Sequence, residues 1–324
     1  MKYKDVPERQ LTTIIEKKDD NSRLDKWLTE RFTYHSRNQW QEIIKKGLVT
    51  VNKQCYRASK ALKPGDVIEY DVEDYEEPEV DFEYSIVYED NIMFAVNKPA
   101  NLPCHPAGVY FKNTLFSKLS EVLDSKIYLI NRLDRETSGI VLFAKSSKIA
   151  KYLSNLFTTK QTSKEYIVIV HGIFPNKLSV MGYLIGDNKS SVRKKRKFVI
   201  EEFYQNRHCI NNSTEFEKAE TSFELINTNN GLSLVKALPM TGRLHQIRAT
   251  LCSLGYPVVG DKIYGLDDTL YLRFIEGKLS ENDKRKLIFD RQALHAKSLS
   301  FMHPLEPERH IRIEAPVPDD FVIF

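Results

Sequence analysis

Residues 131–146 read NRLDRETSGIVLFAKS and are the most informative stretch of this 324-residue chain. Apolar, β-forming runs at 127–130 and 139–145 predict strands on either side of its charged part. Charges between buried strands are costly unless they are paired or take part in function. Asp134, flanked by Arg132 and Arg135, can stay ionised in a partly desolvated cleft and act as a nucleophile or base without a metal. From this stretch alone, a charged loop with Asp134 capping a turn remains the more common explanation.

Further polar segments follow in a fixed order along the chain. Tyr166 lies near the start of a continuous apolar run, and TGRLHQIR (241–248) is dense in hydrogen-bond donors. The segment GDKIYG (260–265) comes soon after it. Taken singly, Tyr166, His245 and Arg248 would each be explained as a buried structural residue. Their joint occurrence in this order indicates one site.

These segments resemble the RluA family of pseudouridine synthases. The resemblance spans about residues 85–324 and is carried by NKPANLPCHP (97–106), NRLDRETSGIVLFAKS (131–146), KEYIVIVHG (164–172), TGRLHQIRATLCSLGYPVVGDKIYG (241–265) and LHAKSLSFMHP (294–304). The strings RLD-x-x-TSG and TGR-x-HQIR are highly specific. The family fold is α+β, with a mixed, largely antiparallel sheet and packed helices. Asn131 departs from the family, which usually has His there, so any proton-carrying role of that position is in doubt.

The resemblance implies an isomerisation of uridine in RNA. The nucleotide is flipped out, the N1–C1′ bond is cleaved, and C5 of the rotated uracil joins C1′; extrusion costs about 2–4 kcal/mol. Asp134 would be the catalytic carboxylate, whether it attacks C1′ or removes a C2′ proton. Arg248 would pair with Asp134, Tyr166 would stack on the base, and Arg132 would fill the gap left in the helix. The other predicted substrate-binding residues are Thr137, Ser138, Gly139, Arg243, His245 and Gln246.

Neither a cofactor nor a metal is predicted. The sequence has no Gly-rich nucleotide-binding loop, no Walker-type string and no cluster with metal-ligand spacing. Its four cysteines include no C-x-x-C pair, and a reduced, cytoplasmic protein is the expectation. No apolar run is long enough to span a membrane, and the charged N-terminus is unlike a signal peptide. We also expect a monomer.

Residues 21–72 are predicted to form a separate small domain. Apolar spacing in 24–28 and 40–44 predicts two helices, and strands are expected at 48–51 and 67–70. SRLDKWL, SRNQWQEIIKKGLVTVN and LKPGDVIEY, in this order, resemble an S4 domain, a small αα-β RNA-binding module. The full predicted order is a flexible tail (1–20), the S4-like domain (21–72), an acidic linker (73–84) and the catalytic domain (85–324).

The net charge of +4 hides an uneven distribution. Residues 22–70 hold ten bases against five acids, residues 71–83 hold eight acids and no base, and residues 189–197 hold six bases and no acid. Basic patches attract RNA phosphates, although solvated surface loops are about as common an explanation. The predicted RNA contacts are Arg23, Arg37, Lys45 and Lys46 in the S4-like domain and Arg193, Lys194, Lys195, Arg196 and Lys197 in the second basic run.

Three alternatives stay open at this point. Large-subunit ribosomal RNA is the expected substrate by analogy of layout, and transfer RNA is the alternative. A non-catalytic RNA- or ribosome-binding protein of the same fold is less favoured, because a binder has no need of an acid facing phosphates. A glycoside hydrolase that uses Asp134 and Glu136 is the least favoured.

Overall fold

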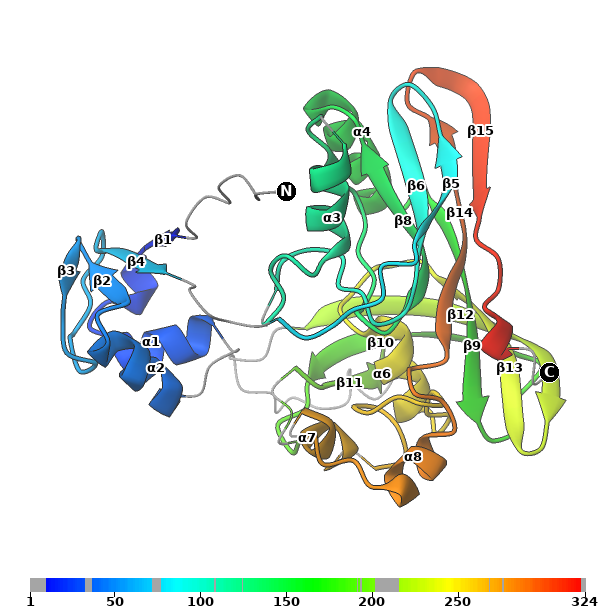
Figure 1. Cartoon of the computed structure of the whole chain (residues 1–324). Coiled ribbons are helices and arrows are strands. Elements are labelled where there is room, and N and C mark those ends of the chain that lie inside the picture. Colours follow the sequence, from blue (N-terminus) through cyan, green and yellow to red (C-terminus); the bar gives the residue numbers. More distant parts are fainter. Residues whose placement is uncertain are drawn as a thin grey trace, which may run out of the picture. The chain divides into compact units, whose positions relative to one another are not determined.

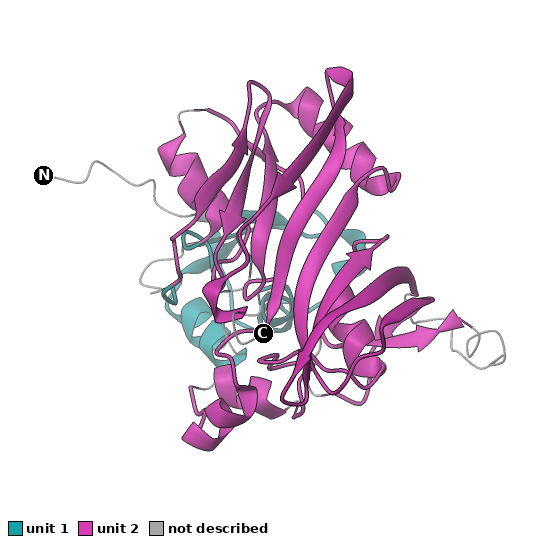
Figure 2. Ribbon diagram, turned by 90° about the vertical axis from the view of Figure 1, so that its right-hand side faces the viewer, with its two compact units in different colours: residues 1–79, 106–113 teal, residues 80–105, 114–324 magenta. Residues whose placement is uncertain are grey.

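The computed structural model describes residues 10–32, 37–71, 77–107, 109–123, 125–190, 192, 194–201, 216–267, 269–275 and 277–321. The chain divides into two compact units (Figure 2). The first comprises Met1–Glu79 and Pro106–Asn113, and the second Val80–His105 and Thr114–Phe324. Within the described residues, no helix is long and apolar enough to cross a membrane.

The first unit is the S4-like domain, and its sheet begins earlier than predicted. Two helices, α1 (Leu24–Arg31) and α2 (Arg37–Lys45), follow a 3-10 turn at Lys17–Asp19. The sheet order is β1 (Gln10–Ile14), β4 (Val67–Asp71), β2 (Val49–Val51) and β3 (Gln54–Cys55). Because β1 pairs along its whole length with β4, the prediction of a flexible tail is wrong for residues 10–20.

Aromatic packing closes this small core. Trp40, on the apolar face of α2, is fully buried and meets the ring of Tyr70 edge-on, with centroids 5.1 Å apart. Leu24 and Leu28 of α1 are buried in the same cluster. Burying an aromatic side chain of this size is the largest single apolar contribution available to so small a unit. The helical spacing predicted from the sequence therefore points the expected residues inward.

Segment 106–113 was predicted to be part of the catalytic domain but belongs to the first unit. The carboxylate of Glu77 accepts the backbone N–H groups of Phe111, Lys112 and Asn113 at 2.7–2.8 Å. The side chain of Asn113 also donates to the carbonyl of Pro78 at 2.9 Å. These bonds join positions more than thirty residues apart, so no local pattern indicates them.

In the described part of the chain, eleven strands of the second unit form one sheet (Figure 1). Its main path runs β11 (Arg196–Ile200), β10 (Lys177–Gly186), β12 (Glu217–Asn229), β13 (Leu232–Pro239), β9 (Ser163–His171), β14 (Leu294–His303), β8 (Ser138–Ala144), β6 (Met93–Lys98) and β5 (Ser85–Glu89). In addition, β15 (Glu306–Glu314) pairs with β14, and β7 (Tyr128–Leu129) pairs with β8. Every pairing is antiparallel except that of β14 with β8, which confirms the mixed, largely antiparallel sheet.

Among the described residues, three helices pack apolar side chains against this sheet, namely α3 (Leu115–Val122), α4 (Ser147–Thr158) and α6 (Gln246–Ser253). The short helices α7 (Thr269–Ile275) and α8 (Glu281–Leu287) follow α6 along the chain. Ser146 caps α4 by accepting from the backbone of Ile149, as a serine at a helix start commonly does. In α4, Ile149 and Leu153 pack in one cluster with Leu142 of β8.

The parallel contact between β8 and β14 lies at the centre of the sheet. Gly139 pairs with Ala296, and a Cβ on Gly139 would come within 2.3 Å of the Ala296 carbonyl oxygen. Gly139 also has φ of +111°, a conformation that favours glycine. The glycine therefore allows two strands to meet immediately beyond the charged loop 131–137.

Candidate active site

Asp134 lies in the loop between β7 and β8, and both ends of that loop are fixed by side chains. Asn131 donates to the carbonyl of Ile140 at 3.1 Å and accepts the N–H of Leu142 at 2.8 Å. An amide can serve as donor and acceptor at once, so the asparagine at this position clips the loop to β8. No proton transfer is needed for that task, which gives a structural reason for the departure noted in the sequence.

Lys98, at the end of β6, supports the other side of the loop. Its fully buried ammonium donates to the carbonyl oxygens of Pro99 at 2.8 Å and Arg135 at 3.1 Å. Burial lowers the pKa of Lys98 to about 8, and the charges of Cys104 and Asp134 act in the opposite direction. The sequence analysis assigned no role to Lys98, although it lies in the NKPANLPCHP segment. A lysine before proline at a strand end gives no local sign of burial.

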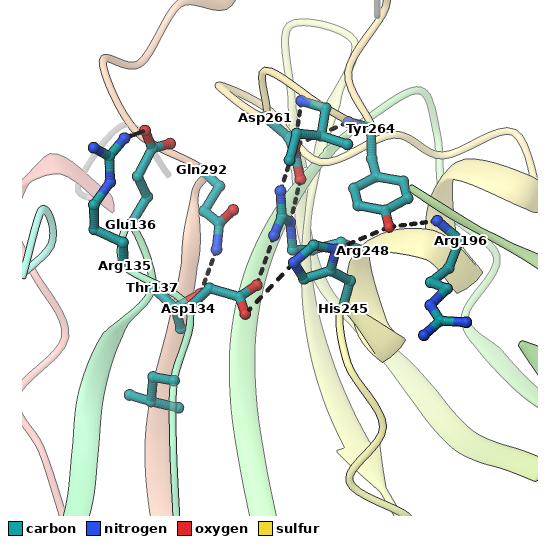
Figure 3. Close-up of polar contacts among 12 residues, drawn as sticks. Asp134, Arg135, Glu136, Thr137, Arg196, His245, Arg248, Asp261, Tyr264 and Gln292 are labelled. Atoms are coloured by element: carbon teal, nitrogen blue, oxygen red, sulfur yellow. Dashed lines mark hydrogen bonds and ion pairs between the residues drawn. The ribbon is translucent and has the colours of Figure 1, made fainter. Parts of the chain in front are cut away.

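Arg248 of α6 joins the Asp134 loop to a second carboxylate. Its Nη1 donates to Oδ2 of Asp134 at 2.6 Å, while Nε and Nη2 donate to the two oxygens of Asp261 at 2.6 and 2.9 Å (Figure 3). The Asp261 side chain is fully buried, whereas 26% of the Asp134 side chain stays exposed. Only Asp134 of the two is therefore open to a substrate.

The electrostatics keep Asp134 ionised. Burial alone would raise its pKa, but the Arg248 guanidinium, followed by His245 and a hydrogen bond from Gln292, together outweigh burial and hold the pKa below its usual value. For Asp261, burial likewise raises the pKa, and Arg248 lowers it below the usual value. Asp261 also accepts the backbone N–H groups of Ile263 and Tyr264 at 2.9 Å. The two carboxylates in turn raise the pKa of Arg248 against its burial. A carboxylate that is charged, oriented and partly exposed can serve as a nucleophile or a base.

A second chain of contacts reaches Asp134 through His245. The Nε2 atom of His245 is 3.9 Å from Oδ1 of Asp134, and Nδ1 is 3.0 Å from the hydroxyl of Tyr264. That hydroxyl accepts the backbone N–H of Arg196 at 2.8 Å. Asp261 and Tyr264 both lie in the segment 260–265, for which the sequence analysis gave no roles. An arginine guanidinium often binds a carboxylate through two parallel hydrogen bonds. The prediction of a buried Arg248 could therefore have indicated a second carboxylate such as Asp261.

Tyr166, predicted to stack on the base, lies on β9 where the strand pairs with Ala237 of β13 and Ala296 of β14. Burial, followed by the charges of Asp134 and Cys104, raises the pKa of its phenol. The phenol is thus neutral at physiological pH and lies within the electrostatic reach of Asp134.

Four predicted substrate-binding residues are buried and support the site. Thr137 accepts a hydrogen bond from Gln292, Ser138 contacts Nδ1 of His295 at 3.0 Å, and Gly139 makes the strand contact described above. Gln246 accepts from the Thr241 hydroxyl at 2.8 Å and the Arg243 N–H at 3.0 Å. These four residues are buried, and the polar side chains among them already bind protein groups. Substrate contact by them stays a prediction.

Arg132 and Arg243 are exposed, as contacts to RNA require. Arg132 lies 3.1 Å from Nε2 of His105, and Arg243 donates to the carbonyl of Lys218 at 3.3 Å. Glu136 does not face Asp134 and binds Arg135 at 3.0 Å (Figure 3). It also binds Lys262 at 2.9 Å. The carboxyl pair that a glycoside hydrolase needs is therefore not formed by these two residues.

In the first unit, the predicted RNA-binding arginines share one buried anchor. Asp25 accepts the Nε atoms of Arg23 and Arg37 at 3.0 Å each, and the amide of Gln41 at 2.7 Å. The arginine side chains remain 47% and 51% exposed. Arg37 and Gln41 thus lie on one face of α2.

The other basic residues predicted to bind RNA differ in how exposed their side chains are. Lys45, Lys46, Lys194 and Lys197 are exposed, Lys195 and Arg196 are half-buried, and Arg193 lies outside the described residues. Arg196 is 3.9 Å from the carboxylate of Glu217. The exposed lysines are the ones free to meet phosphate groups.

Comparisons with known proteins identify related families for both units. The family model described as RNA pseudouridylate synthase matches residues 92–253, and that of the S4 domain matches residues 22–68. The chain is 30% identical to ribosomal large subunit pseudouridine synthase D of Vibrio cholerae, with 97% of this chain and 93% of the relative covered. It is 28% identical to an uncharacterized RNA pseudouridine synthase of Bacillus subtilis, with 96% and 95% covered.

Two further similarities concern another RNA class and the fold. The mitochondrial tRNA pseudouridine(32) synthase of Saccharomyces cerevisiae is 30% identical, with 77% of this chain and 51% of the relative covered. The structure of human RNA pseudouridylate synthase domain containing 1 has a TM-score of 0.55 at 24% identity, covering 74% of this chain and 86% of that one. At that identity the structural match concerns the fold alone.

Proposed function

The chain belongs to the RNA pseudouridylate synthase family, and from this premise we propose that it converts specific uridines of large-subunit ribosomal RNA to pseudouridine, with Asp134 as the catalytic carboxylate. The observation that carries the proposal is the Asp134–Arg248–Asp261 arrangement. It keeps one carboxylate ionised and partly exposed while the other is fully buried.

In this proposal each residue near the flipped nucleotide has a task. Arg248 holds Oδ2 of Asp134, so that the other oxygen is oriented toward the ribose at C1′ or C2′. Tyr166 offers a neutral aromatic face to the uracil ring, and Arg132 occupies the gap in the helix. Asp134 loses its charge if it attacks C1′ or takes the C2′ proton, and recovers it when C5 joins C1′. No net redox change occurs and no water is consumed.

The RNA class is supported by the extent of the similarities. The relative named for large-subunit ribosomal RNA matches nearly the whole chain, including the S4-like unit. The relative named for transfer RNA matches over about half of its own length. Transfer RNA is therefore the second candidate substrate. We also propose that the enzyme works as a monomer, because one chain supplies Asp134, Tyr166 and Arg248, and the cytoplasm remains the predicted compartment.

Release of tritium from C5 of uridine tests the proposal, because the C5 proton must leave during isomerisation. The purified protein is incubated with transcripts of large-subunit ribosomal RNA or of transfer RNA labelled with [5-³H]uridine. We expect release from the ribosomal transcript and none without protein. Release from transfer RNA alone would replace the proposed substrate. Binding of both RNAs without release from either would favour the non-catalytic alternative.

The exposed lysines at the end of α2 provide a separate prediction about RNA affinity. The double change Lys45→Ala and Lys46→Ala should weaken RNA binding and leave kcat at saturating RNA unchanged. Each phosphate contact that is lost should reduce the slope of log K against log salt by about 0.7–0.9. Filter binding from 50 to 200 mM salt (roughly the range over which such slopes are measured) gives both quantities.

A charge-matched control lies on a helix of the catalytic unit. Lys148 and Lys151 of α4 are also exposed, and Lys148→Ala with Lys151→Ala removes the same charge. If both double variants lose affinity and slope equally, then Lys45 and Lys46 contribute general charge rather than phosphate contacts.

A further inference from the structure

The mechanism above leaves one chain of hydrogen bonds without a task. It starts at the backbone of Arg196 on β11, passes through the Tyr264 hydroxyl and ends at the His245 ring beside Asp134 (Figure 3). Only 10% of the His245 side chain is exposed. One ring nitrogen of this buried imidazole contacts the Tyr264 hydroxyl, and the other faces the Asp134 carboxylate. This arrangement indicates a chemical role.

The contacts on the two ring nitrogens favour one position of the imidazole proton. The Arg196 N–H can only donate, so the Tyr264 oxygen is the acceptor of that bond. The hydroxyl proton of Tyr264 is then free to go to Nδ1 of His245, which lies 3.0 Å away. A neutral imidazole that accepts at Nδ1 carries its proton on Nε2. The reverse tautomer would aim a lone pair at the Asp134 carboxylate.

Burial is the main reason that this ring stays neutral. Burial lowers the pKa of His245 to about 4, and the Arg248 cation acts in the same direction, as does Lys194. Asp134 and Asp261 act in the opposite direction and do not prevail. At neutral pH the group facing Asp134 is therefore an N–H donor without a positive charge. A cation at this position would pair with Asp134 and reduce its reactivity.

The backbone of His245 shows that its orientation is imposed. His245 has φ of +56°, a left-handed conformation that is uncommon outside glycine and usually held by its surroundings. Gln246 supplies the restraint, since its side chain fixes Thr241 and the N–H of Arg243, and its own N–H bonds to the Arg243 carbonyl at 3.2 Å. The Nε2–H is thus directed to the site by the loop and by Tyr264 together.

We propose that His245 is a catalytic residue whose Nε2–H donates a hydrogen bond to O2 of the departing uracil. The proposal rests on the proposed function and adds a role to the same site. When the N1–C1′ bond breaks, its electron pair leaves with the base and spreads from N1 onto O2 and O4. This holds whether an Asp134 oxygen bonds to C1′ or takes the C2′ proton as C1′ and C2′ form a double bond. C5 later supplies the electron pair that forms the bond to C1′, as the bond from Asp134 to C1′ breaks or the proton on Asp134 returns to C2′. The C5 proton then leaves and N1 gains a proton, so Asp134 ends as a carboxylate.

Distance favours O2 as the acceptor. A ribose within bonding reach of Asp134 brings C1′ next to His245, and O2 is the charge-bearing oxygen of uracil nearest C1′. The gap of 3.9 Å between Nε2 and Oδ1 of Asp134 is too long for a hydrogen bond between them. The donor is consequently available to a third atom that lies beside both groups. A preorganised donor aimed at developing charge is typically worth about 10²–10³-fold in kcat.

Two amide substitutions of His245 test its two ring nitrogens one at a time. The amide nitrogen of Asn reaches the place of Nδ1, whereas that of Gln reaches the place of Nε2. His245→Asn should therefore lose about 10²–10³-fold in kcat, and His245→Gln should stay within about tenfold of the wild type. Both variants keep a polar side chain in the loop, so a difference between them reports the donor at Nε2.

Sulfur substitution in the substrate identifies the acceptor atom. The probe is a synthetic RNA stem-loop that carries the uridine identified by tritium release, with 2-thiouridine or 4-thiouridine at that position, and isomer formation is followed by nuclease digestion and chromatography. Sulfur accepts hydrogen bonds weakly, so 2-thiouridine should slow the wild type and have little further effect on His245→Asn. The effect of 4-thiouridine should be the same in both proteins.

The outcomes separate this inference from the proposed function. If the wild type isomerises nothing, the proposed function fails. If the wild type is active and His245→Asn matches it, or if 2-thiouridine slows both equally, the role of His245 is overturned. Should His245→Asn fail to fold, Tyr264→Phe takes its place, because it removes the proton donor to Nδ1. A smaller loss of kcat and a weakened 2-thiouridine effect are then expected, and an unchanged thio effect would contradict the inference.

Discussion

Replacing Asp134 with asparagine should lower turnover by about 10⁴-fold or more, the scale seen when a nucleophile or base is removed. The amide has the shape of the carboxylate but can neither attack C1′ nor accept a C2′ proton at neutral pH. Stability should fall little, because Arg248 keeps its two-pronged bond to Asp261 in the variant. RNA affinity should also be nearly unchanged, since the S4-like unit is untouched.

Tritium release, thermal unfolding and filter binding measure these three quantities. Glu136→Gln is the matched control: it removes the same charge two residues away, from a carboxylate that binds Lys262 and Arg135. It should keep turnover within about tenfold. Residual turnover of Asp134→Asn above a few per cent, or an equal loss in both variants, would contradict the assignment of Asp134.

The sequence motifs predict which residues form this site better than they predict what each residue does there. Asp134, Tyr166 and Arg248 come from three separate segments, and the structure brings Arg248 into contact with Asp134 and Tyr166 within its electrostatic reach. Strings as specific as TGR-x-HQIR carry that information. They do not say which side chains face the substrate. Gln246 was itself predicted to bind substrate, next to His245, and is nevertheless buried, because a helix turns each successive side chain by about 100°.

Contacts between segments far apart in the chain could not be predicted from the sequence, for a different reason. The polar segment around β1 has no clear strand pattern, and its order comes from pairing with β4 across more than fifty residues. Asp261 became visible as a partner of Arg248 only when α6 and the following loop were placed together. The strand or helix propensity of a segment does not depend on which distant segment it contacts. The apolar patterns, in contrast, predicted α1 and α2 correctly, because the spacing of apolar residues shows which face of a helix is buried.

Replacing Arg248 with methionine should be the most damaging single change for both stability and activity. It leaves Asp134 and Asp261 without the cation that lies between them. Removing one partner of a buried ion pair typically costs about 3–5 kcal/mol of unfolding free energy. Turnover should fall by about 10³-fold or more, because Asp134 loses both its orientation and the charge that keeps it ionised.

The loss of stability should depend on pH with a definite sign. In the wild type the pKa values of Asp134 and Asp261 are lowered, so their contribution is present above the unfolded value of about 3.9 and is lost as pH falls below it. Without Arg248, burial should raise these pKa values. The folded variant then holds protons that the unfolded chain releases, so its stability falls as pH rises from about 4 toward 7. Urea unfolding at several pH values should show the gap between the proteins widening with pH.

A double variant distinguishes electrostatic loss from lost packing. Adding Asp261→Asn to Arg248→Met removes one of the two unpaired carboxylates, so it should recover part of the stability at pH 7 and flatten the pH dependence. It should recover no turnover, because Asp134 still lacks its partner. If the double variant is no more stable than Arg248→Met, or if Arg248→Met unfolds and turns over like the wild type, then Arg248 does not act by balancing these charges.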